Sequence, residues 1–165
     1  MKTIRRAAIR DLPDLVTLDI KTHYLGWTET AWRRALSQDA VFIACKRQEP
    51  IGFIVISDHA PTAIIRRCGA VDGSKFELID EAVGYAEEAN HTGIEYIVSE
   101  REIEPGLAED ASQPLKDLNF TAVVPLLDGY FKIDGDDVAG VKFVRNLNVD
   151  QRRNLAANQG RPTHG

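Results

Sequence analysis

Apolar residues change their spacing twice between Ala63 and Ser99, and this change restricts the folds open to the chain. Residues 63–67 form a short β-rich run, residues 76–89 repeat apolar side chains at helical intervals, and residues 94–99 are again short and apolar. A strand, a helix and a strand in this order form a right-handed crossover between parallel strands. The segment therefore predicts a sheet with a helix packed on its face.

The flanking segments extend this unit into a mixed α/β (α+β) fold. The polar residues 47–50 separate two β-rich runs and predict an antiparallel hairpin. Strands are expected at residues 3–7, 40–46, 51–57, 121–127 and 140–147, and helices after Asp11, after Thr28 and, interrupted by Pro114, within residues 105–118. A loop with two Asp-Gly turns is expected at residues 128–139. This order predicts a mixed central sheet of about six to seven strands with helices on both faces.

The helix starts and stops carry recognisable residues. Asp11 precedes a Leu-Pro-Asp sequence and is predicted to cap the first helix. Thr28 is predicted to cap the second, with Trp27 and Trp32 packed across its first turn. Gly93 is expected to end the helix at residues 76–89.

Composition excludes several classes of protein. A chain of 165 residues with 44% hydrophobic and 27% charged residues fits one globular domain, assigned to residues 1–149, and a polar tail at 150–165. No apolar run approaches the ~20 residues that cross a bilayer, so we expect a cytoplasmic protein without a membrane segment. The net charge of −5 argues against binding to nucleic acid. Two cysteines and four scattered histidines show no metal-ligand spacing.

Three local motifs occur in a characteristic order along these elements. They are Ile4-Arg5-Arg6-Ala7 leading to Asp11-Leu12, then Pro50-Ile51-Gly52-Phe53-Ile54, then Tyr130-Phe131-Lys132-Ile133-Asp134-Gly135-Asp136-Asp137. Together they resemble the GNAT superfamily of acetyl-CoA-dependent N-acetyltransferases, over about residues 3–147. The resemblance implies a GNAT-like sheet, acetyl-CoA as cosubstrate, and direct attack by a primary amine without a covalent enzyme intermediate.

The resemblance also implies a cofactor loop before the helix at residues 76–89. Members of the family carry a Q/R-x-x-G-x-G/A loop whose backbone N–H groups hold the CoA pyrophosphate. The matching residues here are Ala70, Val71, Asp72, Gly73, Ser74 and Lys75, of which only Gly73 keeps a signature residue. Arg67 and Arg66 are further candidates for the phosphates, and the backbone N–H near Ile65 for the thioester carbonyl. The alternative is an ordinary helix start preceded by surface arginines.

Four residues are candidates for acid–base catalysis. Asp58 and His59 end the strand before the crossover, Glu100 follows the strand after it, and Tyr130 lies in the last motif. Each also has a plainer interpretation, as a surface turn, a solvated loop or a packing tyrosine. The family's usual proton donor, a tyrosine in the fourth helix, is replaced by Leu115, and its asparagine by Ala108.

Two functions follow from these residues. The first is transfer of an acetyl group from acetyl-CoA to a small-molecule amine or a peptide amine. The second is a catalytically inactive GNAT-fold module that binds a ligand or protein partner, because the family signature is lost at Ala70, Lys75, Ala108 and Leu115. A homodimer is compatible with either.

Overall fold

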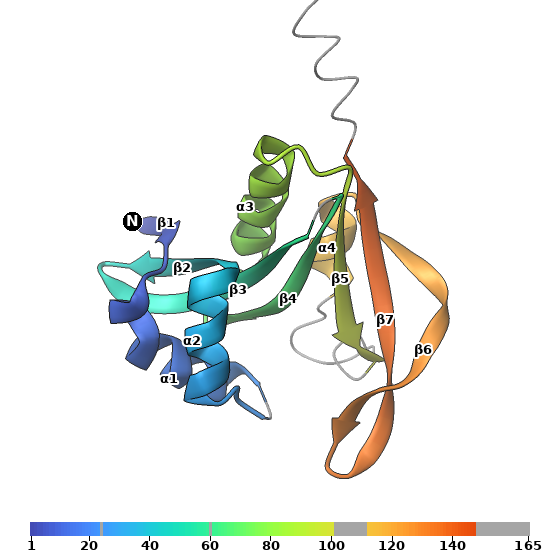
Figure 1. Ribbon diagram of the computed structural model, residues 1–165, viewed down its shortest axis with the longest axis horizontal. Helices are drawn as coiled ribbons and strands as arrows, with labels where there is room; N and C mark the ends of the chain where they lie inside the picture. Colours follow the sequence, from blue (N-terminus) through green and yellow to red (C-terminus); the bar gives the residue numbers. More distant parts are fainter. Residues whose placement is uncertain (24, 60, 101–111, 148–165) are drawn as a thin grey trace, which may run out of the picture.

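Residues 1–23, 25–59, 61–100 and 112–147 are described by the computed structural model, which confirms the mixed α/β fold. Seven strands form one sheet in the spatial order β1-β2-β3-β4-β5-β7-β6 (Figure 1). The strands are β1 (Lys2–Arg6), β2 (Ala40–Lys46), β3 (Glu49–His59), β4 (Thr62–Ala70), β5 (Gly93–Ser99), β6 (Thr121–Ile133) and β7 (Asp136–Asn146). Neighbouring strands are antiparallel except β4 and β5, which are parallel, as the crossover predicts.

Helices cover both faces of the sheet. The helices α1 (Leu12–Thr22), which follows the short 3-10 helix η1 (Ile9–Asp11), and α2 (Glu29–Gln38) lie on one face, and α3 (Lys75–Glu88) and α4 (Ser112–Asp117) on the other (Figure 1). Side chains of a strand alternate between faces, so Ile54 joins the apolar cluster under α3, whereas Phe53 joins the one under α1 and α2. No helix in the described ranges is long and apolar enough to cross a bilayer.

The start of α2 agrees with its sequence signals. Oγ1 of Thr28 accepts a hydrogen bond from the N–H of Ala31 at 3.1 Å, which confirms the predicted cap. The rings of Trp27 and Trp32 lie 5.1 Å apart between their centroids, and Trp32 is fully buried. The predicted packing across the first turn of α2 is therefore confirmed.

The strands β4 and β5 pair over only four residues before they part. The paired residues run from Thr62 opposite Gly93 to Ile65 opposite Tyr96. Beyond Ile65, β4 continues to Ala70 without pairing with β5. The sheet is therefore open at its centre, on the side where β4 leads into α3 (Figure 1).

A β-bulge lies where the two strands begin to part. Val55 of β3 pairs with Arg67, but the next residue, Ile56, pairs with Ile65, which leaves Arg66 as an extra residue in β4. In the described sheet Arg66 has no paired residue on β3 or on β5. Bulges of this kind redirect backbone groups and often lie next to active sites.

The expectation of a loop at residues 128–139 is wrong, because β6 and β7 form one long hairpin. Asp134 and Gly135 make its two-residue turn, with φ values of 54° and 80°, so this Asp-Gly turn is confirmed. The other Asp-Gly pair lies inside β6, where Gly129 has a φ of 64° within the shift of register between Leu127 and Phe131. A turn-forming dipeptide here makes a bulge, not the end of a strand.

Asp11 and Gly93 have roles other than those predicted. The Asp11 side chain does not cap α1; it accepts hydrogen bonds from the N–H of Ala8 at 2.8 Å and from Arg5 at 2.9 and 2.7 Å. The helix α3 ends before Asn90, whose φ is 63°, so Gly93 is the first residue of β5. The predicted helical stretch at 105–118 can be compared only from Ser112 onward, where Pro114 lies within α4.

Replacing Asp11 by asparagine should lower the free energy of unfolding at pH 7 by about 2 kcal/mol. Hydrogen bonds from Arg5 hold the pKa of Asp11 at about 2, against its burial, whereas the ordinary value is 3.8. A carboxyl group whose pKa is lowered by folding stabilises the protein above its unfolded value, and this contribution is lost as the pH falls toward 2. In urea unfolding, the free energy of unfolding of D11N should therefore lie below that of the wild type at pH 7, and this difference should be smaller at pH 3. An equal difference at both pH values would contradict this account.

Candidate active site

The loop predicted to bind an anion joins the end of β4 to α3, beside the opening of the sheet. Gly73 in this loop has a φ of 80°, a conformation that favours glycine, and a Cβ placed on it would meet no atom within 4 Å. Ala70 is buried at the end of β4, whereas Val71 is 50% exposed. Ile65 stands at the other end of this stretch, as the last residue of β4 that pairs with β5. The sequence therefore predicted the position of the loop correctly.

Asp72 places a carboxylate at the start of α3. Its Oδ1 accepts a hydrogen bond from the N–H of Ser74 at 3.1 Å and another from the Ser74 hydroxyl. Its Oδ2 lies 3.5 Å from Nζ of Lys2. Burial acts to raise the pKa of Asp72, but the hydrogen bonds from Ser74 and the charge of Lys2 outweigh it, and the pKa lies below its ordinary value. The backbone N–H of Ser74 thus already has an anionic partner.

A pocket of about 360 Å³ lies beside this loop. Lys75 and Val71 line it from the loop, and Lys21 and Thr22 line it from the end of α1. Neither lysine forms an ion pair with any residue in the described ranges. Lys21 was missed by sequence reasoning because a basic residue in the last turn of a helix is common and gives no sign of what it faces.

Arg67 and Arg66 are directed toward the segment between α1 and α2. Nε of Arg67 donates to Oδ1 of Asp19 at 2.7 Å, and Nη2 donates to the carbonyl of Leu25 at 2.6 Å. Arg66 pairs with Asp39 at 2.7 Å. Both guanidinium groups lie against the ring of Trp27, at 5.2 and 5.1 Å. These contacts fasten the segment between α1 and α2 to β4, and the phosphate role of Arg67 stays a prediction.

Asp19 and His23 belong to a polar cluster that sequence reasoning missed. Asp19 is fully buried, and its Oδ2 accepts hydrogen bonds from the N–H of Trp27 at 2.7 Å and from Nε1 of Trp32 at 3.2 Å. Nδ1 of His23 lies 3.1 Å from Oδ1. Burial acts to raise the pKa of Asp19, but its hydrogen-bond donors outweigh burial and lower it. An acid and a histidine four residues apart are a weak signal, because such pairs are frequent on helices.

Asp58 lies on the far side of the paired residues of β4, away from the loop at residues 70–75. One carboxylate oxygen contacts Nε2 of His91, and the other accepts a hydrogen bond from the Tyr85 hydroxyl at 2.8 Å. Nδ1 of His91 lies 3.2 Å from the carbonyl of Pro61. These hydrogen bonds lower the pKa of Asp58. His59 ends β3, and its side chain lies outside what the structure describes.

Tyr130 and Glu100 lie near the end of β5, on the other side of the opening. Tyr130 is 54% exposed and packs over Gly140, where a Cβ would lie 3.1 Å from the Tyr130 Cβ. Gly140 pairs with Ser99, the residue that precedes the exposed Glu100. The structure therefore brings these two predicted residues to one end of β5 and separates them from Asp58.

In the described part of α4, the position at which the family carries its proton-donating tyrosine holds Leu115. Leu115 is fully buried in the cluster under α3 and α4. Ala108, together with Glu102, which follows Glu100 in the same acidic run, lies outside the described residues.

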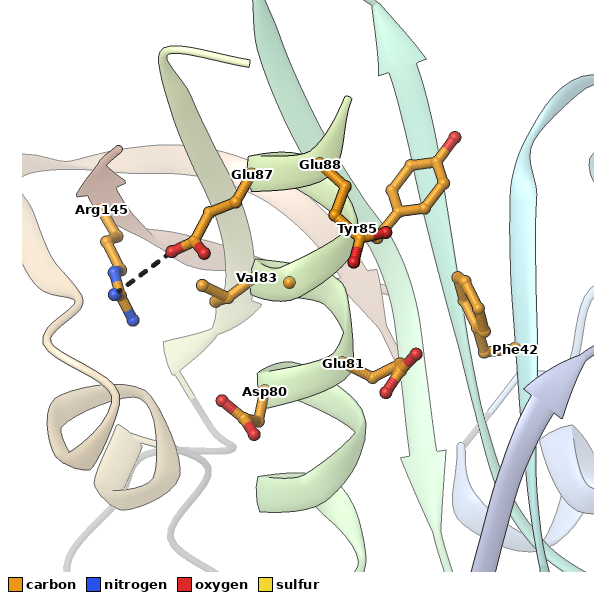
Figure 2. Close-up of a pocket in the computed structure, with 9 residues that line it drawn as sticks. Phe42, Asp80, Glu81, Val83, Tyr85, Glu87, Glu88 and Arg145 are labelled. Carbon is orange, nitrogen blue, oxygen red and sulfur yellow. Dashed lines mark ion pairs between the residues drawn. The ribbon is translucent and has the colours of Figure 1, made fainter. Parts of the chain in front are cut away.

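A second pocket, of about 440 Å³, lies on the outer side of α3 (Figure 2). Figure 2 shows Arg145 and Glu87 on one side of the helix, joined by an ion pair of 3.8 Å, and Phe42 and Tyr85 on the other. Its carboxylates are those of Asp80, Glu81, Glu87 and Glu88. This acidic lining would repel a diphosphate, so the pocket beside Lys21 and Lys75 is the better cofactor site. No group of three His, Cys, Asp or Glu side chains in the described part is arranged to hold a metal ion.

Solved structures resemble this chain closely in fold and distantly in sequence. The ribosomal-protein-S18-alanine N-acetyltransferase of Escherichia coli is 13% identical, with a TM-score of 0.76 over 88% of this chain and 94% of that one. A probable acetyltransferase of Staphylococcus epidermidis is 15% identical, with a TM-score of 0.77 over 90% and 100% of the two chains. Arabidopsis thaliana NAA60 in complex with acetyl-CoA is 18% identical, with a TM-score of 0.77 over 90% and 99%. No family model and no curated protein matches the sequence. The chain thus has the fold of the GNAT N-acetyltransferases, in agreement with the order of its sequence motifs.

Proposed function

We propose that this protein is an N-acetyltransferase that transfers the acetyl group of acetyl-CoA to a primary amine. The observation that carries the proposal is the central opening of the sheet, where β4 and β5 part after four paired residues and β4 runs on into the loop before α3. The bulge at Arg66 lies at this point. The similar structure of NAA60 contains acetyl-CoA, and a second one contains a bisubstrate analogue, which supports acyl-CoA as the ligand of this fold.

Around the loop, side chains are better placed than backbone N–H groups to bind the phosphates of an acyl-CoA. Lys21, near the end of α1, and Lys75, at the start of α3, line one pocket and offer two ammonium groups to the phosphates. Gly73 leaves room for close approach, whereas Asp72 competes for the N–H of Ser74. Acetyl-CoA would supply an activated thioester, so the protein itself needs no nucleophile.

In the proposed mechanism both substrates are held at the opening and react directly. The amine nitrogen loses a proton to Glu100 through water and attacks the thioester carbon, a C–N bond forms, and the C–S bond breaks. Backbone N–H groups at Ile65 and the bulge residue Arg66 are proposed to donate to the carbonyl oxygen, where negative charge develops. Tyr130 is proposed to give a proton to the departing thiolate.

The proposed acceptor is a small-molecule amine or a peptide amine. The similar structure from Escherichia coli is that of a ribosomal-protein-S18-alanine N-acetyltransferase. Its name supports testing peptide amines alongside polyamines as acceptors. Asp58 is proposed only in a supporting position, because its carboxylate is engaged by His91 and Tyr85.

Acetyl-CoA should raise the unfolding temperature of the protein. A ligand that binds only the folded state at a hundredfold excess over its Kd stabilises that state by about 2.7 kcal/mol. Thermal unfolding with no ligand, with CoA and with acetyl-CoA measures this effect. Release of the CoA thiol should then be followed with peptides that begin with alanine and with a panel of small amines.

Tyr130→Phe should lower kcat by roughly tenfold or more at unchanged affinity for CoA, because only proton transfer is lost.

The same measurements separate this proposal from its alternative. A thermal shift without thiol release from any amine would indicate a module that binds the cofactor but does not catalyse. No shift at millimolar acetyl-CoA would contradict the proposal, and partner binding would then be the function to test.

A further inference from the structure

We infer that this protein holds the phosphates of its cofactor mainly by a clamp of two lysine side chains, Lys21 and Lys75, instead of by the backbone of the loop. The inference rests on the proposed function and specifies how its cofactor site works. It makes Lys21, on α1, a binding residue as important as any in the loop itself.

The first observation is that one backbone donor at the start of α3, the N–H of Ser74, is already engaged. The N–H and hydroxyl of Ser74 both donate to Asp72, and Lys2 holds the other oxygen of that carboxylate at 3.5 Å. Lys2 also lies 3.4 Å from Glu77 in the first turn of α3. A diphosphate that approached the start of α3 would meet two carboxylates and only the one ammonium group that lies between them, and like charges repel.

The second observation is a pocket adjacent to this turn with the opposite charge. Lys21 and Lys75 line the same volume of about 360 Å³, and the other residues that line it, Thr22, Ala70 and Val71, carry no carboxylate. Both ammonium groups lack an ion-pair partner among the residues that the structure describes. An unpaired lysine at the rim of a concave pocket can bind an anion without first giving up a protein contact.

The third observation fixes the position of Lys21 relative to the loop. The end of α1 packs directly on β4, because a Cβ on Gly69 would lie 2.9 Å from Cβ of Thr22 and 3.0 Å from Cε1 of His23. Arg67 further ties Asp19 of α1 to the same strand at 2.7 Å. The two lysines therefore sit on elements that are held together, and the pocket between them does not depend on a loose segment.

The test measures binding of inorganic pyrophosphate and of CoA by calorimetry, with the full chain and its variants K21Q, K75Q and K132Q. Lys132 is the control, since its exposed side chain lies on the hairpin of β6 and β7, where it pairs with Asp137 at 3.4 Å. Losing one ammonium–phosphate contact should weaken binding of both probes by roughly tenfold in K21Q and in K75Q. K132Q should bind as the wild type does. Asp72→Asn, which keeps an acceptor for Ser74 but removes a charge, should bind both probes more tightly.

Each outcome decides between the clamp and the proposed function. Wild-type affinity in both K21Q and K75Q, or no binding of either probe by the wild type, would overturn the clamp. Pyrophosphate binding that depends on both lysines, without acetylation of any amine, would support the clamp and count against the transferase. Acetylation with an unchanged KM for acetyl-CoA in both variants would support the transferase and overturn the clamp. Thermal unfolding of each variant without ligand checks that the substitutions, at the exposed Lys21, Asp72 and Lys132 and the half-buried Lys75, leave the fold intact.

Discussion

Replacing Asp19 by alanine is expected to lower the free energy of unfolding by about 3–5 kcal/mol. The carboxylate is fully buried and accepts hydrogen bonds from Trp27, Trp32 and Arg67. Alanine would leave the Arg67 guanidinium, whose side chain is 14% exposed, without its counter-charge. It would also leave the indole N–H of Trp32 without an acceptor in the core, which adds the cost of an unsatisfied buried donor.

The measurement is urea unfolding of D19A beside a matched variant on the same helix. Asp14→Ala removes the same group from an exposed position in the first turn of α1 and should cost about 0.5 kcal/mol. A second control replaces both members of the buried pair, as D19L with R67M, which should cost less than D19A because no isolated charge remains. Equal losses for D19A and D14A would show that the buried cluster contributes nothing.

Alanine at Gly69 should destabilise the protein by about 2 kcal/mol, whereas the same substitution at Gly84 should be neutral or stabilising. A Cβ at Gly69 would overlap Oγ1 of Thr22 and crowd His23, so α1 must move away from β4. A Cβ at Gly84, in the interior of α3, would meet no atom within 4 Å. Alanine there gains about 0.5–1 kcal/mol because glycine is poor in a helix interior.

The substitution at Gly69 should also weaken ligand binding in the pocket beside Lys21. This second effect distinguishes the displacement of α1 from a change in the backbone alone. Thr22, which a Cβ at Gly69 would displace, lines the pocket next to Lys21. G69A should therefore bind CoA more weakly, while G84A should bind it as the wild type does. Unfolding curves and CoA titrations of the two variants provide the comparison. A stability of G69A equal to that of G84A would mean that α1 does not rest on β4 as described.

Local patterns predicted the elements whose cause is local. The helix α3 and the cap at Thr28 follow from apolar spacing and from one side-chain oxygen, and both are confirmed. The crossover placed β4, α3 and β5 correctly, and with them the loop at Gly73. The full length of the hairpin of β6 and β7 was missed because both Asp-Gly pairs were expected in a loop, whereas only Asp134-Gly135 makes a turn and Gly129 lies at a bulge inside β6.

Contacts between distant segments account for what could not be predicted at the site. Arg67 stays a predicted phosphate ligand, but its hydrogen bond to the buried carboxylate of Asp19, 48 residues away, could not be seen in the sequence. Lys21 has no distinctive neighbours in the sequence, and only the packing of α1 on β4 brings it to the loop. Asp72 was assigned to the loop, but its hydrogen bonds to Ser74 depend on the turn that the chain makes there.

Because β4 and β5 pair over so few residues, the sheet consists of two parts that meet at this short contact. Strands β1 to β4 form one part and β5, β7 and β6 form the other, and the strands within each part pair over longer stretches. Near the contact between β4 and β5, the N–H of Thr92 donates to the carbonyl of Pro61 at 2.8 Å, and His91 contacts Asp58. Because only four residue pairs join β4 to β5, we expect a ligand bound at the opening to add contacts between the two parts of the sheet. Amide hydrogen exchange in β4 and β5 should then slow on ligand binding, well beyond the residues that the ligand touches.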